Sequence, residues 1–295
     1  MIDQSLKQPT QTDAAAEDAL AALIDPWLQH MRWRSDFADW RAKRLHSEQF
    51  QTETLQLVVE AAGPLQGRAT LDLGCGMGGF AVAAELAGAD VTALDYNPAY
   101  CAITAVRGDQ LGLQMPVMRA AGEALPLPDA SYDIVTAWDV LEHVQQPDAM
   151  LREIARVLRP GGWALLTAIN RFAFRDPHYH LPLINYLPRP LAELLIDLAG
   201  RSKRRAAFRD RQRLSEMHYF TYGAVERLAA RYGLRTIDLD EQRVRRGELA
   251  PKRARRRAVL QTLDRAGLTL PLYRSYRALY QGTYRLALHK DADRG

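Results

Sequence analysis

A short apolar run that ends in an acid and a cluster of glycines lies near residue 75 of this chain. Residues 71–80 read LDLGCGMGGF, so that Gly74, Gly76 and Gly79 satisfy the G-x-G-x-x-G pattern of dinucleotide-binding folds. Glycine is needed there because the turn uses backbone dihedrals closed to other residues, and because a Cβ atom would hold a ligand off the backbone. Cys75 lies inside the loop, where a small residue is wanted. The pattern predicts a loop that binds a nucleotide-like ligand.

Two carboxylates help to choose among such ligands. Asp72 stands two positions before Gly74, and the combined pattern resembles motif I of class I S-adenosylmethionine-dependent methyltransferases. This carboxylate would repel a pyrophosphate, whereas it favours a ligand that carries an ammonium and a sulfonium. Asp95 ends the next predicted strand, 19 residues after Gly76, where it can accept hydrogen bonds from both ribose hydroxyls of either ligand. Tyr96 follows, and it either lies against the adenine or packs within the fold.

Three later blocks, residues 122–135, 138–144 and 151–162, carry a more specific resemblance. Their order and spacing are similar to the ubiquinone/menaquinone-biosynthesis type of methyltransferase domain. The resemblance implies S-adenosyl-L-methionine as the cofactor, S-adenosyl-L-homocysteine as the product, and adenine contacts from Gly122 and Glu123. The family commonly has Asp-Ala-Glu where this chain has Ala-Gly-Glu, so the adenine contact departs from the family pattern. The predicted cofactor-binding residues are Asp72, Gly74, Cys75, Gly76, Asp95, Tyr96, Gly122, Glu123 and Trp138.

Acidic and imidazole side chains follow the fourth and fifth predicted strands, on the side where the methyl group should lie. Methyl transfer from a sulfonium mainly needs proximity and alignment, and it needs a base only where the acceptor must lose a proton. Asp139 and His143 follow the fourth strand, and His178 and His180 follow the fifth. These four are the predicted catalytic residues, and a purely structural role is the alternative for His143. Two histidines at i and i+2 with the remote His218 are a weak metal signal, so no metal is predicted.

The elements that must position these residues change along the chain from helices to a strand–helix alternation. Residues 13–62 read as helical, with a restart at Asp25-Pro26 and a later helix capped by Ser47. From residue 69 the alternation predicts an α/β fold with a parallel sheet covered by helices on both faces. By resemblance, this is a Rossmann-like, seven-stranded methyltransferase sheet whose last strand is antiparallel, with a helical N-terminal extension and two largely helical insertions.

The expected division has four parts. They are an N-terminal helical cap (1–63), an adenosylmethionine-binding core (64–170), an acceptor-side insertion or lid (171–220), and the C-terminal part of the sheet (221–295) with a basic helical insertion (246–282).

Positive charge is concentrated in two segments. The net charge is +4, yet residues 201–213 alone carry +6 and residues 242–257 carry +7. These segments are either solvated helix faces or contacts for phosphate, nucleic acid or an anionic membrane surface. The second segment lacks the interleaved aromatic residues typical of RNA-binding modules, so nucleic acid is supported only by charge. With two cysteines, no secretory leader and no long apolar run, we expect a cytoplasmic protein.

Together these patterns predict an S-adenosylmethionine-dependent methyltransferase that methylates an O, N or C atom of a small molecule in a biosynthetic reaction. The basic segments favour an acceptor that is anionic or linked to a lipid or a sugar. They also leave open an RNA substrate and peripheral contact with a membrane. A non-catalytic adenosylmethionine-binding protein is the remaining alternative, because a fold does not by itself carry an activity. The oligomeric state is not indicated.

Overall fold

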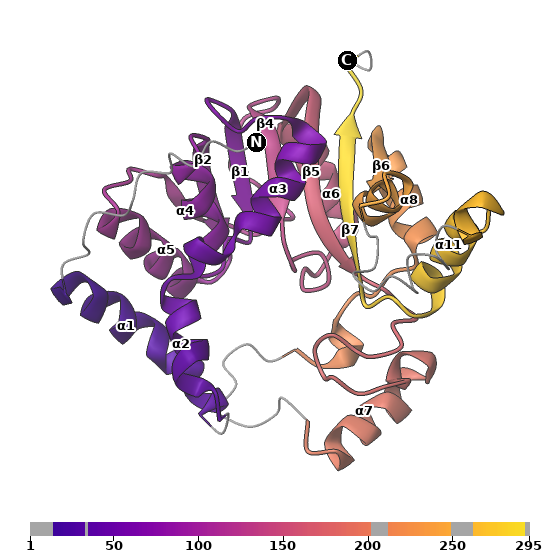
Figure 1. The fold of residues 1–295 in the computed structure, drawn as a ribbon. Coiled ribbons are helices and arrows are strands. Elements are labelled where there is room, and N and C mark those ends of the chain that lie inside the picture. Colours follow the sequence, from indigo (N-terminus) through magenta and orange to yellow (C-terminus); the bar gives the residue numbers. More distant parts are fainter. Residues whose placement is uncertain (1–13, 33–34, 202–211, 249–261, 293–295) are drawn as a thin grey trace.

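The structure, a computed structural model, describes residues 14–32, 35–201, 212–248 and 262–292. These residues form a seven-stranded sheet with the order β3-β2-β1-β4-β5-β7-β6 (Figure 1). The strands are β1 Ala69–Leu73, β2 Asp90–Asp95, β3 Val117–Arg119, β4 Tyr132–Ala137, β5 Leu158–Ile169, β6 Leu234–Asp238 and β7 Thr283–Lys290. Strand β7 pairs antiparallel with β5 and β6, and the other pairings are parallel. The predicted α/β fold with an antiparallel last strand is confirmed.

Helices cover both faces of this sheet. The labelled helices of the described residues are α1 Ala14–Leu28, α2 Phe37–Leu45, α3 Thr52–Ala62, α4 Gly79–Leu86, α5 Pro98–Gln110, α6 Pro147–Val157, α7 Arg189–Leu198, α8 Tyr222–Ala230, α9 Leu239–Arg245 and α11 Thr269–Leu279. Leu71 and Leu73 of β1 join the core formed with α6 and α8. The opposite face packs against α3 and α4. Because successive strand residues point to opposite faces, Asp72 lies on the α3/α4 side of the sheet.

The carboxyl ends of the parallel strands face the region between the N-terminal helices and the segment after β5. In Figure 1, α1 and α2 lie on one side of this edge and α7 lies on the other. Ligands of open parallel sheets bind beyond this edge, so both flanking segments are placed beside the predicted site.

The prediction that the first helix restarts at Asp25-Pro26 is wrong. Helix α1 continues through Pro26, because the face that carries Leu20 and Ile24 stays buried on both sides of the proline. This burial offsets the lost backbone hydrogen bond. Asp25 instead accepts hydrogen bonds from the Arg41 guanidinium of α2 at 2.5 and 2.8 Å, which joins the two helices.

The prediction that Ser47 caps a helix is also wrong. Ser47 begins a short 3₁₀ helix, Ser47–Phe50, and α3 starts only at Thr52. The Ser47 hydroxyl has no hydrogen-bond partner among the residues that the structure describes. It lies so close to the glycine loop that a Cβ atom on Gly79 would be 2.5 Å from it. The 3₁₀ turn therefore brings Ser47 to the predicted ligand loop.

The segment after β5 folds around a small apolar core of its own. Helix α7 buries Ala192 and Ile196 against Tyr179 and Leu214. Its other side carries exposed leucines, including Leu198. Helix α7 is therefore amphipathic.

Both basic segments are only partly described, since residues 202–211 and 249–261 lie outside the described ranges. Most basic residues of the predicted segments 201–213 and 242–257 fall in those gaps. In the described part of the second segment, Arg243, Arg245 and Arg246 each lie within 4.0 Å of a glutamate carboxylate of this chain. Of the helical insertion predicted at 246–282, the described part contains α11. None of the described helices is long and apolar enough to cross a membrane.

Candidate active site

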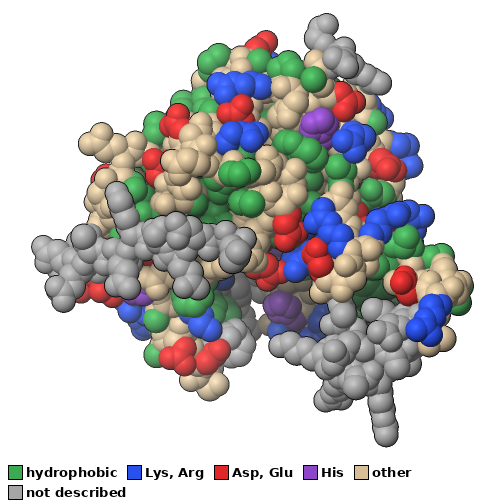
Figure 2. Space-filling view, turned by 45° about the horizontal axis from the view of Figure 1, so that its top comes forward, with side chains coloured by type: hydrophobic (Ala, Val, Ile, Leu, Met, Phe, Trp, Pro, Cys, Tyr) green, Lys and Arg blue, Asp and Glu red, His purple; other side chains and the backbone are tan. Residues whose placement is uncertain are grey.

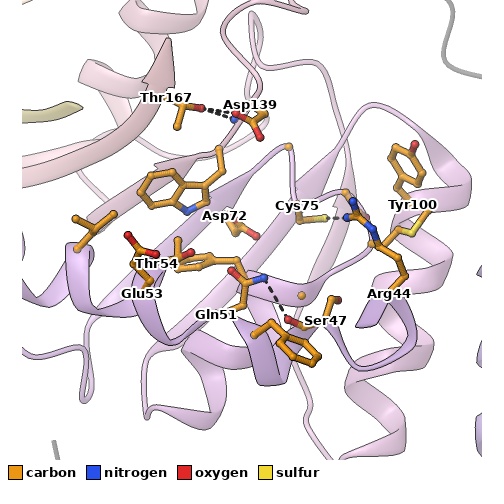
Figure 3. A pocket seen from close by; sticks show the side chains of 18 of the residues that line it. Arg44, Ser47, Gln51, Glu53, Thr54, Asp72, Cys75, Tyr100, Asp139 and Thr167 are labelled. Atoms are coloured by element: carbon orange, nitrogen blue, oxygen red, sulfur yellow. Dashed lines mark hydrogen bonds between the residues drawn. The ribbon is translucent and has the colours of Figure 1, made fainter. Parts of the chain in front are cut away.

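A cavity of about 610 Å³ lies at the carboxyl ends of β1 and β4, within the size range of small-molecule sites. Its wall comes from the glycine loop, from the residues that follow β4 and from the N-terminal cap. Figure 3 shows Asp72 among the lining side chains, with Asp139 and Thr167 on one side and Ser47 and Gln51 on the other. Segments far apart in the sequence thus share one cavity.

Backbone hydrogen bonds hold the glycine loop against β2. The N–H groups of Gly74 and Cys75 donate to the Leu94 carbonyl at 2.7 and 3.0 Å. Gly74 has a φ of +74°, and a Cβ atom there would lie 2.3 Å from Cγ2 of Val140. Gly76 has a φ of +55°, and its Cβ would point into open space. The first glycine is therefore required by packing, and the second leaves room for a ligand at the backbone.

Asp72 is an almost fully buried acid in the cavity wall. Its Oδ1 accepts a hydrogen bond from the Thr136 hydroxyl at 2.8 Å. Burial raises the pKa of Asp72 to about 7, and the bond from Thr136 only partly opposes this effect. A carboxylate that is costly to ionise is stabilised by a cation placed beside it, as predicted for the ammonium and sulfonium of the ligand.

Asp95 ties the glycine loop to the end of β2. Its Oδ2 accepts the Gly76 N–H at 2.9 Å, and its Oδ1 accepts the Asn97 N–H at 2.7 Å. Each carboxylate oxygen has a second lone pair with which it can accept a further bond. Asp95 is not among the residues that line the cavity. The predicted ribose contact therefore stays a prediction, and the described contacts give Asp95 a second task in shaping the loop.

The three residues predicted around the adenine lie outside the lining of this cavity. Tyr96 is 70% exposed, and its ring faces the Arg119 guanidinium at 5.8 Å. Gly122 is packed against Met150 of α6. The Glu123 carboxylate accepts the backbone N–H groups of residues 145 and 146, just before α6, at 2.8 and 3.4 Å. Glu123 therefore holds the start of α6, a contact that sequence reasoning did not foresee.

Trp138 and Asp139 project from the end of β4 into the cavity wall. The Trp138 ring packs edge-on against Phe80, and its buried Nε1 has no partner among the described residues. Asp139 has a φ of +54°, which is strained for a residue with a Cβ. Its N–H donates to the Thr167 hydroxyl at 2.6 Å, and that hydroxyl donates to the Asp139 carboxylate at 2.9 Å. Burial raises the pKa of Asp139, and the nearby Glu142 adds to this rise.

Two of the predicted histidines meet next to Asp139. The rings of His143 and His178 pack edge-on with their centres 5.2 Å apart. Glu142 lies close to both rings. A carboxylate oxygen of Glu142 and one ring nitrogen from each histidine all lie within 4.8 Å of one another. His180 is exposed and is not part of this cluster. Figure 2 shows the surface hollowed between two lobes, with histidine visible in the hollow.

The sequence predicted an N-terminal cap, but it did not indicate which residues of the cap line the cavity. Arg44, Ser47, Gln51 and Thr54 line it, together with Tyr100 of α5. The Arg44 guanidinium lies over the Trp40 ring at 5.3 Å, and no described acid forms an ion pair with it. A single arginine in a helical stretch rich in charges carries no signal of its own, and only the fold brings it to the cavity.

Comparisons with known proteins agree with this geometry. A family model for a methyltransferase domain matches residues 71–166. The ubiquinone biosynthesis O-methyltransferase of Bordetella avium is 36% identical over 179 residues, which cover 58% of this chain and 70% of that protein. The chain belongs to the S-adenosylmethionine-dependent methyltransferases. A second ubiquinone biosynthesis O-methyltransferase, from Photobacterium profundum, is 35% identical over 132 residues, or 44% of this chain and 55% of that protein.

Solved structures support the methyltransferase fold alone. An S-adenosylmethionine-dependent methyltransferase from Mesorhizobium loti superposes with a TM-score of 0.51 at 17% identity, covering 81% of this chain and 97% of that one. The cyclase SpnF superposes with a TM-score of 0.53 at 19% identity, covering 92% and 94%. Because this fold also occurs in a protein named for cyclisation, the reaction of this methyltransferase must be argued from its site.

The cavity residues of this methyltransferase fit the cofactor that its family uses. Asp72 would place a buried acid beside the cationic part, and Gly76 leaves its backbone open. The Trp138 Nε1, which has no partner among the residues that the structure describes, would offer a donor. When bound, S-adenosylmethionine supplies a methyl group on a positively charged sulfur that a nucleophile can displace. The chain's own task is to align the two reactants and exclude water.

Proposed function

We propose that this methyltransferase transfers the methyl group to a hydroxyl oxygen of a small molecule. The observation that carries the proposal is the cluster of Glu142, His143 and His178. The cluster lies beside Asp139, and Asp139 lines the cofactor cavity. A hydroxyl must lose its proton during methylation, so it benefits from an acid–imidazole group at the reacting centre. The relatives named O-methyltransferases support transfer to oxygen over nitrogen or carbon.

Each predicted cofactor residue receives a role in this proposal. Asp72 lies beside the ammonium and sulfonium, with the Arg44 guanidinium facing the carboxylate of the methionine part. Asp95 accepts bonds from the ribose hydroxyls. The remaining predicted residues complete the binding site, with Tyr96, Gly122 and Glu123 on the adenine side and Gly74, Cys75, Gly76 and Trp138 around the methionine part.

The four segments divide this work. Residues 1–63 cap the cofactor and residues 64–170 form its binding core. Residues 171–220 act as the lid over the acceptor, and residues 221–295 complete the sheet and carry the second basic insertion. The exposed leucines of α7 suit an acceptor with an apolar tail.

A product assay tests the proposal directly. The protein is incubated with S-adenosylmethionine and matched sets of hydroxyl, amine and activated-carbon acceptors, and S-adenosylhomocysteine is measured. We expect product only with hydroxyl acceptors, at a rate that His178→Asn lowers by about 100-fold or more. RNA is included as a further acceptor at low and high salt. Methylation of RNA that weakens steeply with salt, or of amines alone, would contradict the proposal.

We expect the affinity for S-adenosylmethionine to fall as the pH drops below about 7. Burial raises the pKa of Asp72 to about 7, so protonation removes the charge that attracts the cationic ligand. Binding below that pH must release the proton, which costs up to about tenfold in affinity per pH unit. Calorimetric titrations between about pH 5.5 and about pH 8 measure this slope. Asp72→Asn should bind S-adenosylmethionine more weakly than the wild type at about pH 8, and its affinity should not change with pH in this way. If the affinity of the wild type is as independent of pH as that of the variant, the charge of Asp72 does not attract the cofactor.

A further inference from the structure

Glu142 is a buried carboxylate without a hydrogen bond from any described residue. It is 1% exposed, and neither of its oxygens has a hydrogen-bond partner in the described part of the chain. An isolated buried carboxylate is strongly disfavoured, so a donor or a positive charge must stand near it. The candidates are the two imidazoles, with Nε2 of His178 at 3.7 Å and Nε2 of His143 at 4.0 Å from Oε1.

The hydrogen bonds of His143 exclude it as the donor in its neutral form. Its Nδ1 faces the side-chain oxygen of Gln212. The amide of Gln212 is held in this orientation because its own Nε2 donates a hydrogen bond to the His143 carbonyl at 2.8 Å. Because the Gln212 side-chain oxygen can only accept, Nδ1 of His143 carries the proton and its Nε2 is bare. The donor to Glu142 is therefore His178.

Nε2 of His178 is itself buried and has no hydrogen-bond partner among the described residues. Two unpartnered, complementary groups thus lie 3.7 Å apart, and a small side-chain rotation brings them to hydrogen-bond distance. With its proton on Nε2, neutral His178 has a bare Nδ1. No hydrogen bond joins that Nδ1 to any residue that the structure describes, so it is available to a substrate.

The backbone around His178 is held by another buried acid. Asp176 is fully buried, and its Oδ1 accepts the N–H groups of His178 and Tyr179 at 2.9 and 2.7 Å. Its Oδ2 accepts the Tyr219 hydroxyl at 2.9 Å. The imidazole is thereby carried on a fixed turn beside Asp139, which lines the cofactor cavity.

We propose that Glu142 and His178 act as a proton-accepting pair for the acceptor hydroxyl; this inference rests on the proposed function. The hydroxyl proton moves to Nδ1 of His178 while the oxygen forms a bond to the methyl carbon. The carbon–sulfur bond breaks, its electron pair stays on sulfur, and S-adenosylhomocysteine leaves with neutral sulfur. Glu142 is a positioning residue: it fixes the tautomer of His178 and stabilises the imidazolium that forms. Asp139 and His143 are the other titratable groups that face the pair.

Nitrogen NMR of the histidine rings tests the pair without any acceptor. In the full-length wild type we expect His178 to carry its proton on Nε2, with Nδ1 bare. Glu142→Leu should abolish this preference, and Glu142→Gln, whose amide oxygen can still accept, should keep much of it. Glu226→Gln, on the exposed side of α8, is the matched control and should leave the spectrum of His178 unchanged. A proton on Nδ1 in the wild type, or a preference that survives Glu142→Leu, would overturn the inference.

Kinetics with catechol as the hydroxyl probe give the second readout. Both Glu142→Leu and Glu142→Gln should lower kcat by about 100-fold, because the Gln variant keeps the hydrogen bond but not the charge. The KM for S-adenosylmethionine should change by less than about threefold, whereas a merely structural defect would change this KM as well. If no hydroxyl acceptor is methylated, the proposed function is contradicted. If hydroxyl acceptors are methylated but the proton of His178 does not depend on Glu142 as expected, this inference alone is contradicted.

A divalent cation between Glu142, His143 and His178 is the competing explanation, and the same proteins decide it. The wild type and Glu142→Gln are titrated with Zn²⁺, Mg²⁺ and Mn²⁺ by calorimetry, and turnover is measured with and without a chelator. We expect no stoichiometric binding that depends on Glu142 and no loss of turnover with the chelator. Binding at one site that is lost in Glu142→Gln, with activity restored by the metal, would replace the proton-accepting pair by a cation site.

Discussion

Asp95→Ala is expected to lower the affinity for S-adenosylmethionine by about 100-fold. The carboxylate accepts the Gly76 N–H of the glycine loop and the Asn97 N–H at the start of α5, and the proposed function adds the two ribose hydroxyls. Hydrogen bonds to a charged group contribute about 1.5–3 kcal/mol each, so the loss of two ribose bonds alone accounts for this factor. Calorimetric titration with S-adenosylmethionine and S-adenosylhomocysteine measures it.

The matched control for Asp95 lies on the same strand. Asp90 begins β2 at the opposite edge of the sheet and is exposed, so Asp90→Ala should leave the affinity within about twofold. Asp95→Asn keeps the size of the side chain and should fall between the wild type and Asp95→Ala. If Asp95→Ala binds the cofactor as the wild type does while remaining folded, the assignment of the ribose site is wrong.

Arg107→Met is expected to lower the free energy of unfolding by about 3–5 kcal/mol. The Arg107 side chain is 1% exposed and pairs with the Glu48 carboxylate at 2.6 Å. It also donates to the carbonyls of Arg44 and Leu45 in the N-terminal cap and of Met77 in the glycine loop. Methionine fills similar space but leaves three carbonyls and a carboxylate without their donor. Urea-induced unfolding of the variant and the wild type measures the difference.

The same substitution should weaken cofactor binding, because Arg107 joins the cap to the glycine loop on both sides of the cavity. An exposed ion pair provides the control. Arg231 is 67% exposed at the side chain and lies 3.3 Å from Asp148, so Arg231→Met should cost less than about 1 kcal/mol and leave cofactor affinity unchanged. A loss of stability in Arg107→Met no greater than that in Arg231→Met would refute this account of the cap.

The strand–helix core was predictable because its signals are local. Helices α4 and α5 belong to the strand–helix alternation predicted from residue 69. Glycine begins α4, and Asn97 followed by Pro98 begins α5. The N-terminal helices were less predictable. Pro26 and Ser47 have strong local preferences, and the tertiary burial of α1 and the approach of the cap to Gly79 override both.

The candidate site likewise contains residues that the local sequence predicted and contacts that only the fold explains. Asp72, Gly74 and Gly76 lie within one short stretch of chain, so their pattern could be identified in the sequence by its resemblance to motif I of class I S-adenosylmethionine-dependent methyltransferases. Glu123 belongs to an equally local motif, yet its carboxylate is engaged with the backbone before α6. A motif states which residue types stand together in the sequence, but hydrogen-bond partners depend on which elements the fold brings near.

The sequence by itself determined the fold class and the methyl donor, because the cofactor loop and the strand periods are encoded by neighbouring residues. Only the tertiary structure decided how the proposed acceptor side is built. It brought Glu142 together with His178, 36 positions later in the chain, and it brought Arg44 to the same cavity as Asp72. These contacts join segments that have no local pattern in common, and the free energy that holds them comes from burial across the whole fold.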